Sequence, residues 1–330
     1  MKDRRETTKM WLVMGCMLLT GASQVELSPV KKVKVGKAPN FSSMSPDGRY
    51  LFVTNFASDD VSILNCATKT TEKTFYAGFK PLGIVLSPAG DRIYVTNYKS
   101  GLVKVVDVKT YRIIDDIKVG GMPTYIVTSP RGHTIYVTNY GRGKVGRIDF
   151  IDTASHKVTR SVEVGVRPIV ATISPLGERL YVPCAGSNDL YVIDVNDGRV
   201  IGEIPVGIGP NGIAVTPDGN QLLVANSGTN DLSVIDLIDL EETRRVRVGN
   251  KPFSLKVNAK GYVFVVETGS RTVTILSPEL EKIHSIRVGK KPVDIQVSPD
   301  SQFVYVTDER EHRILVLKVS GLSNGLDFPK

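Results

Sequence analysis

The sequence predicts an all-β protein: a seven-bladed β-propeller built from four-stranded antiparallel blades. Two observations lead to this prediction. A junction of the form VGxxP occurs seven times at steps of 40 to 45 residues, and each copy leads to a segment of the YVTN type. The junction prolines are Pro39, Pro81, Pro123, Pro168, Pro210, Pro252 and Pro292. Repeats of this period, rich in Val and Ile and separated by tight turns, are typical of propeller blades.

Each copy follows the same internal plan. A short apolar strand such as IVL or IAV follows the proline, and a turn of the SPDG type ends it. A second strand ends in the YVTN-type segment, and a polar loop leads to a third strand such as YVID or SVID. A fourth strand returns to the next VG. Short β-branched strands separated by Gly, Pro and Asp turns favour an antiparallel meander.

The two ends of the repeat region complement each other. Val30–Gly36 has the pattern of a fourth strand with no blade before it, and Ile314–Val319 that of a third strand with no fourth strand after it. We therefore expect the N-terminal strand to complete the seventh blade, which removes the open sheet edges. The propeller is predicted over residues 30–319, with a C-terminal tail at residues 320–330.

The YVTN, SPDG and VGxxP motifs resemble those of the YVTN-repeat β-propeller family of exported proteins. The resemblance covers essentially the whole chain after residue 30. Propellers of the WD-repeat type are excluded, because the only tryptophan is Trp11, which lies before the repeats. The resemblance implies an exported protein, at the cell surface or in the periplasm, that binds other molecules. It does not imply one particular activity, because one fold can support many functions.

Residues 1–23 have the features of an export signal. A charged start (MKDRRETTK) precedes an apolar run from Met10 to about Leu19, and small residues follow. The run is shorter than the roughly 20 residues of a membrane span, so we expect no transmembrane segment after signal removal. Loss of the leader would change the formal charge from +8 to about +6. The VMGC tetrapeptide resembles a loose lipobox and leaves open a lipid anchor at Cys16.

The motifs that bind cofactors or carry catalysis are missing or out of context. Gly207, Gly209 and Gly212 match the dinucleotide motif GxGxxG, but a strand follows where that motif needs a helix N-terminus. The four histidines are expected in separate turns and loops, three on one face of the ring and one on the other, and the sequence contains no CxxCH. We therefore expect no metal site and no cofactor, and we favour a protein that is not an enzyme.

Three other residues have side chains that can take part in chemistry. Cys184 replaces the Asn of YVTN and is expected to be a packed side chain, and Cys66 lies three blades away, so no disulfide is expected. Asp294, in PVDIQV, is the clearest acid on the innermost strands. A single carboxylate does not make a catalytic site.

Basic residues gather at one face of the predicted ring. The loops that enter the first strands surround the channel mouth, because the first strands line the channel. In the third copy, three extra residues fall between Asn139 and Asp152, in or next to a loop on the same face. The nine candidate binding residues are Lys37, Lys80, Arg167, Lys251, Lys290 and Lys291 from the entering loops, and Arg142, Lys144 and Arg147 from the insertion. A concave mouth of one charge sign focuses potential, although such charges can also serve solubility alone.

The sequence thus predicts an exported, monomeric, non-enzymatic binding module whose mouth face binds a protein or an anionic polymer. A nucleic acid is the weaker ligand, because only Phe79, Tyr98 and Tyr140 are close enough to stack on bases. The alternative is an enzyme or accessory subunit of a periplasmic, quinone-linked oxidation system. A purely architectural surface-layer role fits less well with a chain that has one domain.

Overall fold

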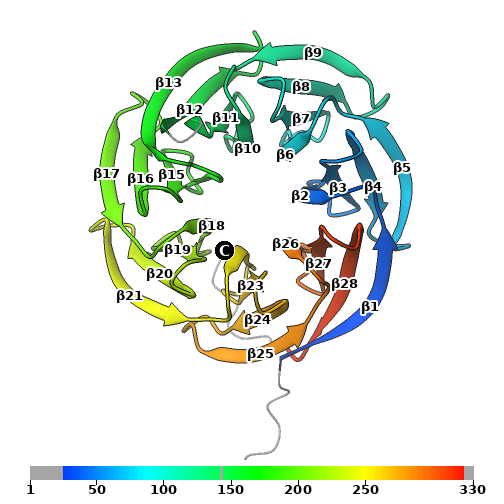
Figure 1. Cartoon of the computed structure of the whole chain (residues 1–330), viewed down its shortest axis with the longest axis vertical. Helices are drawn as coiled ribbons and strands as arrows, with labels where there is room; N and C mark the ends of the chain where they lie inside the picture. Colours follow the sequence, from blue (N-terminus) through cyan, green and yellow to red (C-terminus); the bar gives the residue numbers. More distant parts are fainter. Residues whose placement is uncertain (1–24, 142–143, 323–330) are drawn as a thin grey trace, which may run out of the picture.

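The structure, a computed structural model, describes residues 25–141 and 144–322, and it contains seven four-stranded antiparallel sheets arranged in a ring around a central channel (Figure 1). The first blade consists of β2 (Pro39–Met44), β3 (Tyr50–Asn55), β4 (Asp60–Asn65) and β5 (Thr70–Tyr76). The second blade consists of β6 (Pro81–Leu86), β7 (Arg92–Asn97), β8 (Leu102–Asp107) and β9 (Ile113–Lys118). The third blade consists of β10 (Pro123–Thr128), β11 (Thr134–Asn139), β12 (Val145–Asp152) and β13 (Lys157–Val166). The fourth blade consists of β14 (Thr172–Ile173), β15 (Arg179–Cys184), β16 (Asp189–Asp194) and β17 (Val200–Pro205). The fifth blade consists of β18 (Pro210–Val215), β19 (Gln221–Asn226), β20 (Asp231–Asp236) and β21 (Glu241–Arg247). The sixth blade has β22 (Pro252–Val257), β23 (Val263–Glu267), β24 (Thr272–Leu276) and β25 (Lys282–Arg287), and the seventh has β26 (Pro292–Val297), β27 (Phe303–Asp308), β28 (Arg313–Ser320) and β1 (Glu26–Lys34). The predicted fold class is confirmed, and the described residues include no helix long and apolar enough to cross a membrane.

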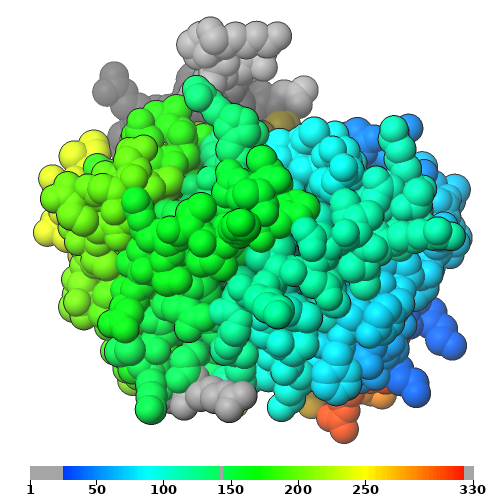
Figure 2. Space-filling model, turned by 90° about the horizontal axis from the view of Figure 1, so that it is seen from above, coloured from blue at the N-terminus to red at the C-terminus, as the bar shows by residue number. Residues whose placement is uncertain are grey.

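The core of the molecule lies between neighbouring blades. Seven apolar clusters fill the seven interfaces; the one between the first two blades joins Phe52 and Ile63 to Ile93 and Val95. The second and third strands of each blade are almost wholly buried, because they pack against a neighbouring blade on both faces. The fourth strands are largely exposed and form the rim, which Figure 2 shows from the side of β9 and β13.

The N-terminal strand closes the ring, as predicted. β1 pairs antiparallel with β28 along its length and is the outermost strand of the seventh blade. It begins at Glu26, four residues earlier than the predicted Val30, and its register shifts between Pro29 and Lys31. A proline is tolerated there because an edge strand leaves one row of backbone groups unpaired. Leu27 and Val33 anchor β1, since both side chains are buried.

The two sequence motifs that define the repeat are in direct contact. The glycine of VG lies against the side chain that ends the YVTN-type strand, so that a Cβ atom on Gly36 would lie 2.6 Å from Cγ of Asn55. Gly207 has the same relation to Asn226, at 2.5 Å. Any side chain on these glycines would overlap the buried amide. The recurrence of VG together with YVTN therefore reflects one packing requirement, repeated from blade to blade.

The three-residue insertion lengthens one hairpin. β12 has eight residues where the other third strands have five or six, apart from the terminal β28, and β13 has ten. Val145 pairs with Val166, so the hairpin extends toward the face that carries the loop at residues 140–144. The insertion lies where the sequence places it. Arg142, one of the candidate binding residues, lies outside the described residues.

Candidate functional site

Two sets of loops form the mouth face, and backbone hydrogen bonds join them in all seven blades. In each blade, the residue that follows the YVTN-type strand donates its N–H to the carbonyl of the residue before the junction proline. The donor and acceptor pairs are Phe56 and Ala38, Tyr98 and Lys80, Tyr140 and Met122, Ala185 and Arg167, Ser227 and Gly209, Thr268 and Lys251, and Glu309 and Lys291, at 2.9 to 3.1 Å. The prediction that both sets of loops share one face is thus confirmed. We call the seven donor residues the mouth ring.

A second set of contacts links each blade to the next at the same face. The backbone N–H of Lys80 donates to Oδ1 of Asp59 at 3.0 Å, and that of Lys251 donates to Oδ1 of Asn230 at 2.8 Å. At the ring closure, the N–H of Ala38 lies 3.1 Å from Nδ1 of His312. One of the four histidines therefore contributes to the junction between the last blade and the first.

Three of the candidate cations lie on strained backbone. Lys80, Arg167 and Lys251 have φ values of 56°, 61° and 52°, in the left-handed region where Gly209 occupies the equivalent position of the fifth blade. This conformation costs about 1 kcal/mol or more for a residue with a side chain. The interblade hydrogen bonds of Lys80 and Lys251 offset part of that cost.

The two faces of the ring differ in charge. Among the described residues of the mouth-face loops, ten are Lys or Arg (Lys37, Lys80, Lys99, Lys144, Arg167, Lys251, Arg271, Lys290, Lys291 and Arg310) and three are Asp or Glu (Asp59, Glu309 and Glu311). The loops of the opposite face contain seven basic residues (Arg49, Lys69, Lys109, Arg112, Arg131, Arg199 and Lys260) and nine acidic ones (Asp47, Asp91, Glu178, Asp197, Asp218, Asp239, Glu279, Glu281 and Asp300). The formal balance is thus +7 on the mouth face and −2 on the other. A difference of this kind orients a charged partner before contact.

Intramolecular ion pairs neutralise part of the predicted site. Nζ of Lys290 lies 2.8 Å from Glu311, and Nζ of Lys291 lies 2.6 Å from Glu309, both in the seventh blade. Lys80 lies 3.9 Å from Asp59. Within the described part of the chain, the side chains of Lys37, Lys144 and Lys251 are exposed and have no ion pair. The site is therefore most accessible to an anion away from the seventh blade.

Arg147 has a different environment from the other candidates. Its Nε lies 2.7 Å from Oδ1 of Asp149, which is 1% exposed, and one of its terminal nitrogens donates to the carbonyl of Val119 at 2.6 Å. Asp149 also accepts hydrogen bonds from Asn139 and Ser161. The guanidinium thus compensates a buried carboxylate inside the blade.

Aromatic side chains concentrate on one side of the mouth ring, a feature that the sequence reasoning noted only in part. Phe56, Tyr98 and Tyr140 occupy equivalent positions in the first three blades, whereas the corresponding residues of the fourth to seventh blades are Ala, Ser, Thr and Glu. A hollow of about 350 Å³ lies beside the first two of these rings; its lining residues are Ala38, Asn40, Phe56, Leu82, Tyr98, Lys291 and Glu309. The signal was present in the sequence as the residue after YVTN, but its equivalence across blades follows only from the hydrogen bonds.

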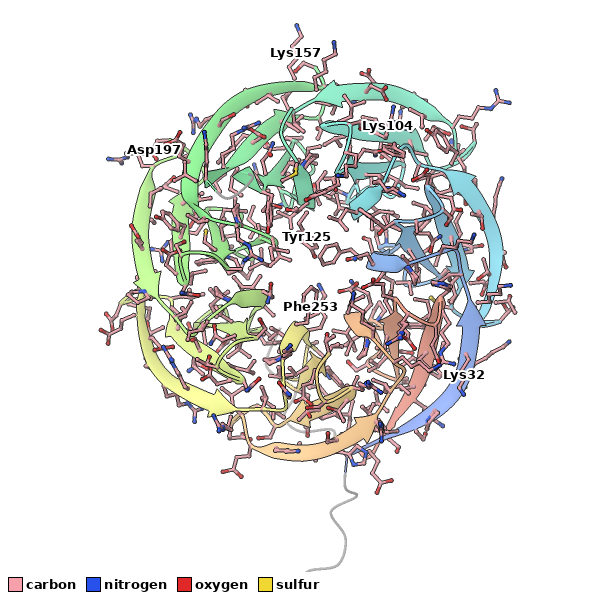
Figure 3. All side chains as sticks on the ribbon, in the orientation of Figure 1. Lys32, Lys104, Tyr125, Lys157, Asp197 and Phe253 are labelled. Atoms are coloured by element: carbon pink, nitrogen blue, oxygen red, sulfur yellow. The ribbon has the colours of Figure 1, made fainter. Side chains whose placement is uncertain are left out.

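The central channel is lined by the innermost strands of the blades (Figure 1). Tyr125 and Phe253 project into it (Figure 3), and the edge of the Tyr125 ring contacts Phe41 at a centroid distance of 4.8 Å. One cavity in the channel has a volume of about 100 Å³ and is lined by Phe41, Tyr125, Val127, Val170, Ala171, Thr172, Gly212, Ile213, Phe253, Ser254, Leu255, Lys256 and Asp294.

Asp294 connects three blades at the wall of this channel. Its Oδ2 accepts hydrogen bonds from the backbone N–H and the hydroxyl of Ser42, at 2.9 and 2.7 Å, and its Oδ1 accepts one from Ser254 at 3.1 Å. Burial raises the pKa of Asp294, and the charge of Lys256 together with the hydrogen bonds from Ser42 opposes the rise. The carboxyl therefore serves as a polar link between the innermost strands of the first, sixth and seventh blades.

Comparison with known proteins gives a family. The model of the cytochrome D1 heme domain matches residues 13–213, which is more than half of the chain. The chain belongs to the cytochrome D1 heme domain family. A solved structure, the Kuenenia stuttgartiensis hydrazine synthase, is similar over 86% of this chain and 96% of that chain, with 26% identity and a TM-score of 0.76. Comparison with curated proteins finds no match. These findings support the propeller, while membership in the YVTN-repeat family stays a prediction.

The name of the D1 heme family raises the question of whether the channel fits a heme. Heme iron is held by His, Cys, Met or Tyr, and Tyr125 is the one side chain of these types among the described residues that line the cavity. The cavity of about 100 Å³ is also smaller than the roughly 300 to 1,000 Å³ of sites that hold molecules of cofactor size. All four histidines lie away from the channel, and the described residues contain no cluster of metal-ligating side chains. The described residues therefore do not fit a heme in the channel.

Proposed function

We propose that this member of the D1 heme family is an accessory propeller subunit of an exported redox assembly, which docks through its mouth face to an acidic partner protein. The difference in charge between the two faces carries the proposal. A subunit that is basic on one face only has a preferred orientation for association, and its association rate rises with the charge difference and falls with salt.

The family and the structural neighbour support the redox part of the proposal. The family is named for a cytochrome heme domain and the structural neighbour is named a hydrazine synthase, and redox chemistry is consistent with both names. The residues that line the channel cavity favour an accessory role over a catalytic one, because they do not fit a heme. This is the accessory alternative stated above, in which the basic mouth serves as the docking face. The quinone linkage has no separate support, and the proposal does not depend on it.

An exported location is part of the same proposal. The leader at residues 1–23 and Cys16 lie outside the described residues, so export and a lipid anchor rest on the sequence pattern. A redox assembly in the periplasm or at the cell surface is consistent with both.

Charge reversal on the two faces tests the docking face. Lys37, Lys144 and Lys251 are exposed mouth-face cations, and their triple Glu variant is compared with a matched triple variant of the opposite face, Lys109→Glu/Arg112→Glu/Arg131→Glu. Both variants change the net charge equally. We expect a tagged mature protein, added to a periplasmic extract of its own organism, to recover an acidic redox protein, and only the mouth-face variant to lose it. Equal recovery by both variants would overturn the docking face.

The accessory role has its own test. The mature protein, purified from its native host, is expected to show no Soret absorbance and no redox activity alone. A stoichiometric Soret band would contradict the accessory role and point to a heme site outside the channel.

A further inference from the structure

We infer that the aromatic half of the mouth ring, defined as Phe56, Tyr98 and Tyr140, is the anchor of the docking face. Its ligand is an acidic segment of a partner protein that carries an aromatic or large aliphatic side chain. The inference rests on the proposed function and names which part of the face carries the affinity and what the partner presents there.

The repeat itself identifies these three positions as exceptional. The mouth ring makes the same backbone hydrogen bond in all seven blades, and Ala185, Ser227 and Thr268 make it as well as the aromatic residues do. The scaffold therefore does not require a ring at this position. Aromatic residues in three consecutive blades place apolar surface at the rim of a basic mouth. Aromatic side chains and Arg are enriched at the positions from which protein interfaces gain most of their affinity.

Cations already lie against these rings. Nζ of Lys80 is 5.4 Å from the ring centroids of both Phe56 and Phe79, and Nζ of Lys99 is 5.7 Å from that of Tyr98. The guanidinium of Arg167 lies 5.7 Å from the ring of Tyr140. Each contact holds a positive charge next to an apolar surface, so an incoming segment meets both in the same place.

The hollow between the seventh, first and second blades supplies a place for an apolar side chain. Phe56, Leu82 and Ala38 give it apolar walls, and the ion pair of Lys291 with Glu309 borders it. The rings of Phe56 and Tyr98 lie 6.2 Å apart at an interplanar angle of 58°, so they present two inclined walls. Its volume of about 350 Å³ accommodates one large side chain.

Charge complementarity decides the chemistry of the segment. The mouth face has a formal balance of +7 over its described loops, so carboxylates on either side of the anchor residue would face cations. A single-stranded nucleic acid would need open ring faces on which bases can stack in series. Here cations lie over rings of the aromatic half, and Phe56 and Tyr98 are inclined to each other, which favours an acidic peptide.

Three probes separate the ligand classes: poly-glutamate, a random glutamate–tyrosine copolymer of the same length, and oligo-dT. We expect the wild-type protein to bind the copolymer about tenfold more tightly than poly-glutamate, since one buried aromatic anchor contributes on that scale. The double variant Phe56→Ala/Tyr98→Ala should bind both polymers equally. Tyr98→Phe, which keeps the ring, should preserve the preference.

A matched control keeps the test specific. Tyr76 is an aromatic residue on the outermost strand β5 that is 65% exposed and does not belong to the mouth ring, so Tyr76→Ala should leave the preference for the copolymer unchanged. Thermal unfolding of each variant verifies that the fold is intact.

The outcomes are distinguishable. Unchanged copolymer preference in the double variant, or equal binding of both polymers by the wild type, would overturn the anchor while leaving the docking face intact. Tighter binding of oligo-dT than of the copolymer would overturn it in favour of nucleic acid. Absence of any salt-dependent binding would instead refute the docking face itself.

Discussion

Replacement of Arg147 by alanine should destabilise the protein more than it weakens anion binding. The side chain donates to buried Asp149 at 2.7 Å and to the carbonyl of Val119 at 2.6 Å. Loss of a partner from a buried ion pair costs about 3 to 5 kcal/mol. Here the Arg147 side chain is 36% exposed, and Asn139 and Ser161 still donate to the carboxylate, so we expect about 2 to 3 kcal/mol.

The expected loss corresponds to a fall in melting temperature of about 3 to 5 °C for a domain of this size. The only tryptophan, Trp11, precedes the propeller, so unfolding of the propeller is followed by circular dichroism or tyrosine fluorescence. The control is Lys144→Ala, an exposed cation of the same loop region, which should melt like the wild type. If Arg147→Ala melted within 1 °C of the wild type and lost polyanion binding, as Lys144→Ala is expected to, the assignment of Arg147 to the blade interior would be refuted.

Three further predictions concern the scaffold. Gly207→Ala should destabilise the protein by about 1 to 3 kcal/mol, because its Cβ atom would lie 2.5 Å from the Asn226 side chain. In urea unfolding, the double variant Gly207→Ala/Asn226→Ala should lose less free energy of unfolding than the two single variants together, and additive losses would contradict the contact. Because the pKa of Asp294 is raised in the folded state, the contribution of this carboxyl to the free energy of unfolding is fully present below its pKa in the unfolded chain, and it is lost as the pH rises through its pKa in the folded protein. Urea unfolding of Asp294→Asn between pH 4 and 8 should therefore lack this decline, and a pH profile identical to that of the wild type would exclude Asp294 as its cause. Removal of residues 25–34 exposes the edge of β28 and should give oligomers in light scattering, whereas a monomer with unchanged melting would show that β1 is dispensable.

Most of the fold could be predicted because it is repeated. Seven copies of one pattern show the strand order, the face of each loop and the location of the insertion, since an error in one copy is corrected by the others. The start of β1 was the weakest point: Glu26 to Pro29 contain a proline and precede the first repeat, so no equivalent segment marks them as a strand. The pairing with β28 is a long-range contact that local pattern cannot reveal.

The candidate site could be predicted only as a set of charges. The sequence shows that basic residues share a face, and the loop geometry agrees. It does not show that Lys290 and Lys291 are paired with Glu311 and Glu309, or that Arg147 points into the blade. These differences depend on which side chains meet across loops, and spacing along the chain does not encode such contacts.

The sequence by itself determined the architecture, because the period of the apolar pattern and the placement of glycine and proline specify strands and turns locally. It also determined the charge of the mouth face, since the topology of a closed meander assigns each loop to a face. Only the tertiary structure decided which charges remain available, how the glycine of VG packs on the residue that ends YVTN, and which side chains line the channel cavity. Those properties depend on distances between residues that are brought together by ring closure, and they exist only once all seven blades have packed.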